Sequence, residues 1–251
     1  MTVGDAVLLI PAGVLAGIAG TAGGVASLIS YPALLLAGLP PFAANVTNNI
    51  ALLPIAPGAA LGSRQELRGR WPWLRRWLWP ATAASAVGAA LLLCTGTGPL
   101  ERIVPFLVLL AVAALLVEPV IQARRQRAAR PRVPHRLLLP LCLVPIGVYS
   151  GYFGAGAGVM MLSTVLLLVE PELRQANAIK NVLTGSATIP ASFAFAVFGP
   201  VHWLAALPLG IGLFAGAWLG PAVARRTPRT VLRVAIAVCG LVLAAQLGGL
   251  L

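Results

Sequence analysis

Long apolar runs separated by short polar stretches make up most of this chain. We predict ten apolar helical segments, at residues 3–20, 23–39, 43–63, 72–95, 99–121, 137–153, 157–170, 174–198, 201–223 and 229–250. Most of them reach the length of about 20 residues that a helix needs to cross a hydrocarbon core about 30 Å thick. The pattern therefore predicts an all-α polytopic membrane protein.

Three segments, the first, second and seventh, are short for a full crossing. The first two meet at the glycine-rich stretch Gly20–Gly24, and the sixth and seventh meet at Gly154–Gly158. Each pair is either two tilted spans or one re-entrant helical hairpin. Exposed backbone at such a tip is tolerated only inside protein or beside water, so both interpretations place the glycines away from lipid.

Composition agrees with lipid as the solvent. Hydrophobic residues form 59% of the 251 residues, charged residues form 10%, and the mean hydropathy is +0.92, whereas a soluble domain carries about 25% charged residues. The net charge of +12 would suggest nucleic acid in a soluble protein, but here the arginines stand in short loops between apolar runs. We expect no nucleic-acid partner. The N-terminal segment lacks a basic n-region, so we interpret it as a membrane segment rather than a cleaved signal peptide.

Arginine is distributed unevenly between alternate loops, which predicts the orientation. With the N-terminus outside, the basic residues concentrate in the inner loops, at residues 64–76, 124–136, 170–174 and 225–229. By the positive-inside rule, we expect a multi-pass protein of the cell inner membrane. Both termini are then external (periplasmic), and the Arg-rich loops are cytoplasmic.

The two halves of the chain resemble each other. Residues 13–20 match residues 147–154, and residues 44–49 match residues 176–181 after a two-residue shift. Because each half holds five segments, an odd number, the second half enters the membrane upside down, as in the inverted repeats of secondary transporters. We predict a first repeat at 1–121, a cytosolic Arg-rich linker at 122–136 and a second repeat at 137–251.

The glycine clusters are the first candidates for a substrate site. A broken helix frees backbone N–H groups, and a helix N-terminus favours anions. The alternative is tight packing of helices through small residues, which fits Gly13 and Gly17 and their counterparts Gly147 and Gly151 well. The candidate residues in the two clusters are Gly20, Thr21, Gly23, Gly24, Gly154, Gly156 and Gly158.

Polar residues inside the third and eighth segments are the second candidates. Side chains at i, i+3 and i+4 share one face of a helix, and a polar face in lipid should meet protein or water. We expect this face either to bind an oxygen-rich solute or to join helices by hydrogen bonds. Its residues are Asn45, Asn48, Asn49, Asn177, Lys180, Asn181 and Thr184.

Lys180 is distinctive because it is the only lysine in the chain. It lies inside the eighth segment, and no acidic residue lies within one helical turn of it. A cation in a membrane segment costs about 2.5 kcal/mol or more, so we expect Lys180 to meet an anionic substrate. The alternative is that it snorkels to the inner interface beside Arg174.

Groups typical of catalysis or metal binding are sparse. Cys94, Cys142 and Cys239 show no paired spacing, and the acids stand at the predicted ends of spans or in loops rather than deep within them. We expect no metal, no cofactor and no enzymatic activity. If transport is coupled to H⁺ or Na⁺, the ion must use carbonyls, amides, hydroxyls or the substrate's own protonation.

The two Gly-rich hairpins, each followed by Ala-Asn-x-x-(Asn/Lys)-Asn, resemble the TauE/SafE sulfite exporter family of anion permeases over about residues 13–245. The resemblance implies an alternating-access transporter of a small anion such as sulfite or an organosulfonate, with its site between the repeats. A passive anion channel and a transporter of small carboxylates are the alternatives. We leave the exact substrate, the direction of transport and a homodimeric assembly open.

Overall fold

The computed structural model describes residues 3–127 and 135–224, and every regular element in these ranges is an α-helix. The bounds follow the predicted segments closely. The helices are α1 (Val3–Gly23), α2 (Ser27–Leu36), α3 (Pro41–Ala51), α4 (Ile55–Gly62), α5 (Trp71–Thr95), α6 (Thr97–Arg127), α7 (His135–Tyr152), α8 (Ala157–Leu168), α9 (Leu173–Phe198) and α10 (Trp203–Ala224).

Four stretches of the described helices are long and apolar enough to cross a membrane, at Trp71–Thr95, Arg102–Val120, Leu173–Phe198 and Trp203–Gly220. Shorter apolar helices accompany them. Large apolar side chains also cover the outside of the bundle: Trp79 is 79% exposed and Phe198 is 76% exposed. A soluble monomer rarely exposes so much contiguous apolar surface. The prediction of an all-α polytopic membrane protein is confirmed.

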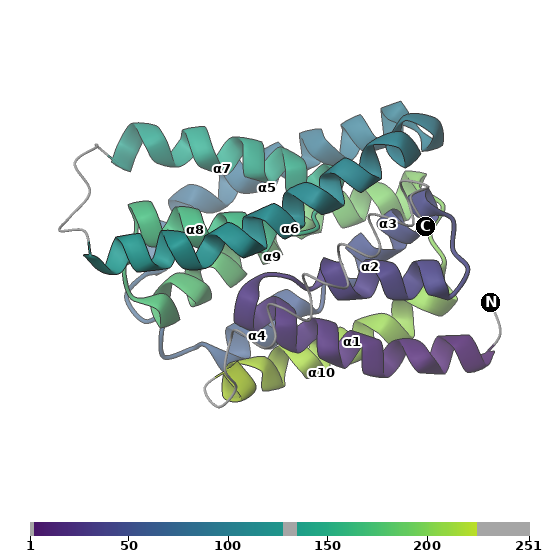
Figure 1. The fold of residues 1–251 in the computed structure, drawn as a ribbon, viewed down its shortest axis with the longest axis horizontal. Coiled ribbons are helices and arrows are strands. Elements are labelled where there is room, and N and C mark those ends of the chain that lie inside the picture. The colour runs from purple at the N-terminus through teal and green to yellow at the C-terminus, as the bar shows by residue number, and fades with distance from the viewer. Residues whose placement is uncertain (1–2, 128–134, 225–251) are drawn as a thin grey trace.

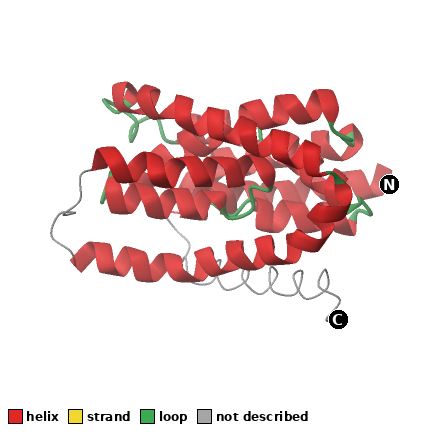
Figure 2. Cartoon of the chain, turned by 90° about the horizontal axis from the view of Figure 1, so that it is seen from above, coloured by secondary structure: helices red, strands yellow, loops and turns green. Residues whose placement is uncertain are grey.

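The helices lie side by side in one bundle, with α5 and α7 along one edge and α1 and α10 along the other (Figure 1). No strand interrupts the bundle within the described ranges (Figure 2). The two most extensive helix pairs are α1 with α10 and α5 with α7. Each of these pairs therefore joins a helix that precedes residue 122 to a helix that follows residue 134.

Glycines allow this close pairing. A Cβ atom added at Gly17 would collide with the Leu213 carbonyl of α10, and one added at Gly151 would collide with the Ser85 carbonyl of α5. Helices in lipid pack through such small residues because their backbones can then approach closely. The packing interpretation of Gly13, Gly17, Gly147 and Gly151 is therefore the one that the structure supports.

One predicted segment differs from the structure. The segment expected at 43–63 is two helices, α3 and α4, with turn residues between them at 52–54. Pro54 explains the break, because proline has no N–H for the helical ladder and its ring clashes with the preceding turn. The matching region of the second half lacks a proline at that place and forms the continuous α9.

Two helices extend into the predicted linker between the halves. Helix α6 continues to Arg127, and α7 already begins at His135. Both ends of the linker predicted at 122–136 are therefore helical. The predicted segment 229–250 and Cys239 lie outside the described residues.

Candidate functional site

A cavity of about 70 Å³ lies where the two glycine-rich breaks meet. Since about 10–15 Å³ of such volume holds one water, the cavity has room for a small ion. It draws its walls from both halves of the chain. The lining residues are Gly20, Gly24, Ala26, Ser27, Asn49, Leu52, Ile55, Ser150, Gly154, Ala157, Gly158, Lys180, Asn181, Thr184, Gly185 and Thr188.

Positive backbone φ angles break the chain at both glycine clusters. Gly24 has φ +78°, Gly154 has φ +81° and Gly156 has φ +75°, which are conformations that only glycine adopts readily. The two breaks also touch, because a Cβ atom added at Gly24 would collide with the backbone of Gly158. These two glycines are the matched positions of the sequence repeat. The structure thus brings the tips of the two helical pairs, α1–α2 and α7–α8, into direct contact.

Two helix N-termini face the cavity. Helix α2 begins at Ser27 and α8 begins at Ala157, and both residues line the cavity wall. Neither helix has a side-chain cap or an acidic residue in its first turn. Turn hydrogen bonds already occupy the N–H groups of Leu28 and Ala157, and the N-terminus of each helix still carries the positive end of its dipole. This end of the cavity therefore favours negative charge.

Lys180 brings a full positive charge to the same wall. Its side chain is 1% exposed, and its Nζ donates a hydrogen bond of 3.0 Å to the carbonyl oxygen of Gly20 in α1. A lysine that snorkels would extend its amino group to the interface. The burial of Lys180 and its bond across the two halves exclude that alternative.

Asn49 and Asn181, which match each other in the repeat, both line the cavity. Asn181 is 5% exposed, and its Nδ2 has no hydrogen-bond partner among the described residues. A buried donor without a partner costs about 1–3 kcal/mol, so an acceptor in the cavity would relieve this cost. Thr184 follows one turn later, with its hydroxyl donating to the Lys180 carbonyl at 2.9 Å.

Eight of the fourteen predicted site residues line the cavity. They are Gly20, Gly24, Asn49, Gly154, Gly158, Lys180, Asn181 and Thr184. The other six lie elsewhere: Thr21, Gly23, Asn45, Asn48, Gly156 and Asn177.

Five of these six have identifiable contacts. The Thr21 hydroxyl donates to the Gly17 carbonyl at 2.9 Å, and Asn48 accepts a bond from Ser30 at 2.5 Å. Gly156 abuts Ala111 of α6. Asn45 and Asn177 donate to the backbone carbonyls of Tyr152 and Thr21, at 2.9 Å and 2.6 Å.

Eight further residues complete the wall, and the prediction did not include them. Thr188 had a signal, because it follows Thr184 and Asn181 on the same helical face at spacings of four and seven residues. Ser27 and Ser150 stand close to the glycine clusters. Leu52 and Ile55 carried no signal, because their exposure to the cavity depends on the break between α3 and α4.

The two halves of the chain contribute lining residues of different polarity. The wall from α9 carries Lys180, Asn181, Thr184 and Thr188, whereas the matching stretch of the first half contributes Asn49 followed by Leu52 and Ile55. A solute in the cavity therefore meets charged and polar groups of α9 together with apolar groups from the end of α3 and the start of α4. Among the described residues, no group of three or more His, Cys, Asp or Glu side chains is positioned to hold a metal ion.

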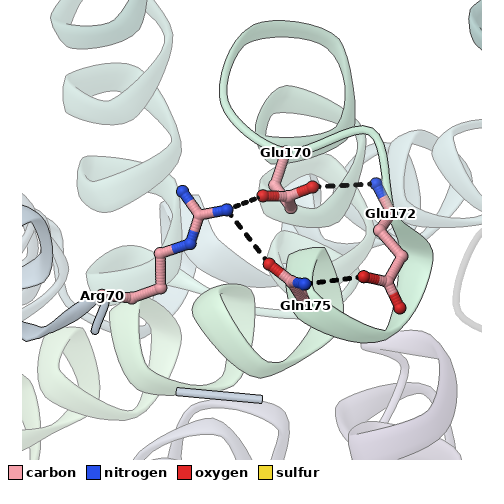
Figure 3. Close-up of polar contacts among 4 residues, drawn as sticks. All are labelled: Arg70, Glu170, Glu172 and Gln175. Carbon is pink, nitrogen blue, oxygen red and sulfur yellow. Dashed lines mark hydrogen bonds and ion pairs between the residues drawn. The ribbon is translucent and has the colours of Figure 1, made fainter. Parts of the chain in front are cut away.

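A second polar cluster lies outside the cavity lining and also joins the halves (Figure 3). Arg70, at the start of α5, forms an ion pair with Glu170 in the α8–α9 connection and donates to Gln175 at 3.0 Å. Glu170 also accepts the backbone N–H of Glu172 at 3.1 Å. The connections before α5 and before α9 are thereby held at the same end of the bundle.

Comparisons with known proteins agree with this architecture. The chain is 26% identical to a "Probable membrane transporter protein" of Haemophilus influenzae over 89% of this chain and 87% of that protein. It is 28% identical to "Probable membrane transporter protein ORF9" of Sinorhizobium sp. over 95% of this chain and 90% of that protein. No solved structure matches. The sequence model of the sulfite exporter TauE/SafE family matches residues 8–247, and the chain therefore belongs to this family of membrane transporters.

Proposed function

We propose that this membrane transporter carries a small oxyanion, such as sulfite or an organosulfonate, by alternating access at the cavity between the two glycine tips. The observation that carries the proposal is the convergence of Lys180, the Asn181 amide and two helix N-termini on one cavity. All of these groups are positive or donate hydrogen bonds.

An oxyanion suits such a site chemically. Its oxygens are acceptors only, and hydrogen bonds to a charged group are about twice as strong as neutral ones. The cavity offers an ammonium, amides, hydroxyls and the positive ends of two helix dipoles, and no lining residue is acidic. The Lys180 ammonium would repel a cation, and a neutral apolar solute would accept no hydrogen bond from the amides and hydroxyls of the wall.

The polarity of the walls sets an orientation for the anion. The oxygens would lie toward Lys180, Asn181 and Thr184, and a short carbon arm would lie toward Leu52 and Ile55. An organosulfonate has both parts, and sulfite has only the first. We therefore expect both to bind, with sulfite filling only the polar side.

Alternating access follows from the duplicated arrangement. In an inverted repeat, two similar halves exchange conformations, so that a central site opens to each side in turn. The cross-packing of α1 on α10 and of α7 on α5, and the meeting of Gly24 with Gly158, support two matched halves of this kind. No coupling ion and no second subunit is part of the proposal.

The test is a panel of anions measured for thermal stabilisation of the purified protein. A ligand that binds only the folded state adds RT ln(1 + [L]/Kd), about 2.7 kcal/mol at 100 times Kd. We expect sulfite and short sulfonates to raise the Tm, and chloride, which carries the same single charge as a sulfonate, to raise it far less. If none of the oxyanions shifted the Tm, the proposal would fail. A shift with carboxylates alone would make small carboxylates the substrate class.

Counterflow in proteoliposomes tests the mechanism separately. A carrier that alternates its access exchanges labelled internal anion for unlabelled external anion and saturates at high concentration. A passive channel shows neither behaviour, so linear flux without counterflow would reject alternating access while leaving the anion site in place.

We also propose the orientation with external termini in the inner membrane. The Arg70–Glu170 contact supports it, because it holds two predicted cytoplasmic connections at the same end of the bundle. Cysteine variants R68C, at an exposed residue of the connection before α5, and T97C, at the exposed first residue of α6, test it. The native cysteines are replaced by serine in both variants, because Cys94 is free and exposed. In intact cells an impermeant maleimide should then label T97C and not R68C, and the reverse result would invert the orientation.

A further inference from the structure

Two asparagines outside the cavity make the same contact from opposite halves. Asn45 of α3 donates its Nδ2 to the carbonyl oxygen of Tyr152, the last residue of α7, at 2.9 Å. Asn177 of α9 donates its Nδ2 to the carbonyl oxygen of Thr21, in the last turn of α1, at 2.6 Å. The two asparagines match each other in the sequence repeat. Each one therefore binds the end of the interrupted helix that belongs to the other half.

The accepting carbonyls explain why these bonds matter. The last carbonyl groups of a helix have no intrahelical partner, and α1 and α7 both end inside the protein, next to their glycine breaks. The asparagine amides supply the missing donors. They thereby fix where each helix stops and where the chain turns at Gly24 or Gly154.

The hydrogen bond from Nδ2 determines how each asparagine side chain is oriented, because the Oδ1 atom of the same amide makes no hydrogen bond to the described residues. The Oδ1 atoms of Asn45 and Asn177 are buried and have no hydrogen-bond partner among the described residues. Neither asparagine lines the cavity. The amide is thus held by its donor end alone, and removing that donor removes the contact between the halves.

The same two asparagines also connect to the cavity. Asn49 lies four residues after Asn45, and Asn181 lies four residues after Asn177, so each cavity amide stands one turn beyond a helix-end contact on the same face. The bond from Asn45 sets the distance between the glycine break at Gly154–Gly158 and Asn49. The bond from Asn177 sets the distance between the break at Gly20–Gly24 and Asn181.

We propose that Asn45 and Asn177 are a crossed pair of positioning residues, each of which holds the glycine tip of the opposite half against the cavity amide of its own half. The proposal deepens the proposed function, because the site that it positions is the transport cavity. The substrate itself touches neither residue. Both bonds would persist through the transport cycle, since exchanging the conformations of the two halves only exchanges the roles of the two asparagines.

The first test needs no substrate. Hydrogen–deuterium exchange is measured on the full-length protein in lipid nanodiscs for N45L and N177L, because leucine has nearly the shape of asparagine but no donor. N45L should speed exchange about five- to tenfold in peptides covering residues 149–158 and leave residues 20–27 near the unmodified rate. N177L should produce the reverse pattern.

Asn48 offers a matched control on the same helix as Asn45. It is equally buried, but its bond to Ser30 stays within one half. N48L should therefore speed exchange in α2 and not at residues 149–158. For N45L and N177L, three results would overturn the proposal: faster exchange only in the half that carries the variant, an equal rise at both glycine breaks, or no rise at either break. Where the leucine variants do not fold, N45S and N177S are used instead, because the shorter serine side chain does not reach the same carbonyl oxygen.

A second measurement separates positioning from substrate contact. In proteoliposomes, N45L and N177L should lower the maximal rates for sulfite and for a short alkyl sulfonate by the same factor. N181L should change the ratio of the two KM values, because Asn181 lines the cavity. An altered KM ratio in N45L would make Asn45 a substrate ligand instead. If the unmodified protein moved neither anion, the proposed function would fail, while the exchange experiment would still decide the crossed pair.

Discussion

Replacing Lys180 by methionine removes the cavity's only full positive charge among its lining residues while keeping a long unbranched side chain. The Lys180 Nζ lies 3.0 Å from the Gly20 carbonyl oxygen, and the side chain is 1% exposed. The ammonium is therefore held in place before any anion arrives, so an anion that enters the cavity meets a positioned donor.

The magnitude follows from the strength of a charged hydrogen bond. Such a bond contributes about 1.5–3 kcal/mol net, and each 1.4 kcal/mol corresponds to a tenfold change in affinity. K180M should therefore weaken oxyanion binding about 10- to 150-fold. The Tm of the unliganded protein should change much less, because losing the bond to Gly20 is offset by no longer burying an ammonium.

The assay is the Kd for sulfite, from the concentration dependence of the Tm, for the unmodified protein, K180M and R174M. Arg174 lies on the same helix but is exposed and does not line the cavity, so R174M should keep the original Kd. Equal Kd values for all three proteins would refute the role of Lys180. An equal loss in K180M and R174M would point to a general surface potential rather than a positioned ammonium.

Two further predictions concern packing and the second polar cluster. Gly17→Ala should destabilise the protein by about 1–3 kcal/mol through overpacking, because its Cβ would collide with Leu213 of α10. Gly23→Ala should stay near the original stability, because its Cβ would meet only a Val25 methyl at 3.7 Å. Reversible unfolding in mixed micelles distinguishes the two variants, and equal losses of stability would contradict the packing argument. Arg70→Ala should cost about 1 kcal/mol more than Glu170→Gln, because the Glu170 side chain is 8% exposed and would lose its partner, while the Arg70 side chain is already 38% exposed. The same unfolding assay measures this difference, and the opposite order would show that the Arg70 charge rather than the buried carboxylate governs the cluster.

Much of the fold was predictable because the transfer of a helix into lipid depends on local composition. The apolar runs located nine of the ten segments within the described residues, and the glycine-rich stretches at Gly20–Gly24 and Gly154–Gly158 located the two interruptions. The interior position of Lys180 was also predictable, since a single lysine within an apolar run requires a partner inside the protein or a polar cavity.

The orientation of individual side chains was decided by the tertiary structure. Asn45 and Asn49 share a helix face in the sequence pattern, yet only Asn49 lines the cavity, because the end of α7 takes up the amide of Asn45. Asn177 and Asn181 divide their roles in the same way across α1. Helical periodicity predicts which residues share a helix face. The neighbouring helix determines which residue of that face binds a backbone carbonyl and which lines the cavity.

Span length, charge placement and glycine content are properties of single segments, so the pattern of residues alone predicts a helical membrane protein with two glycine breaks. Folding brings the two breaks into contact at Gly24 and Gly158, places Lys180 against Gly20, and exposes Leu52 and Ile55 to the cavity. These contacts join residues more than one hundred positions apart or depend on the turn at Pro54. Their energies belong to packing between helices, which local patterns do not encode.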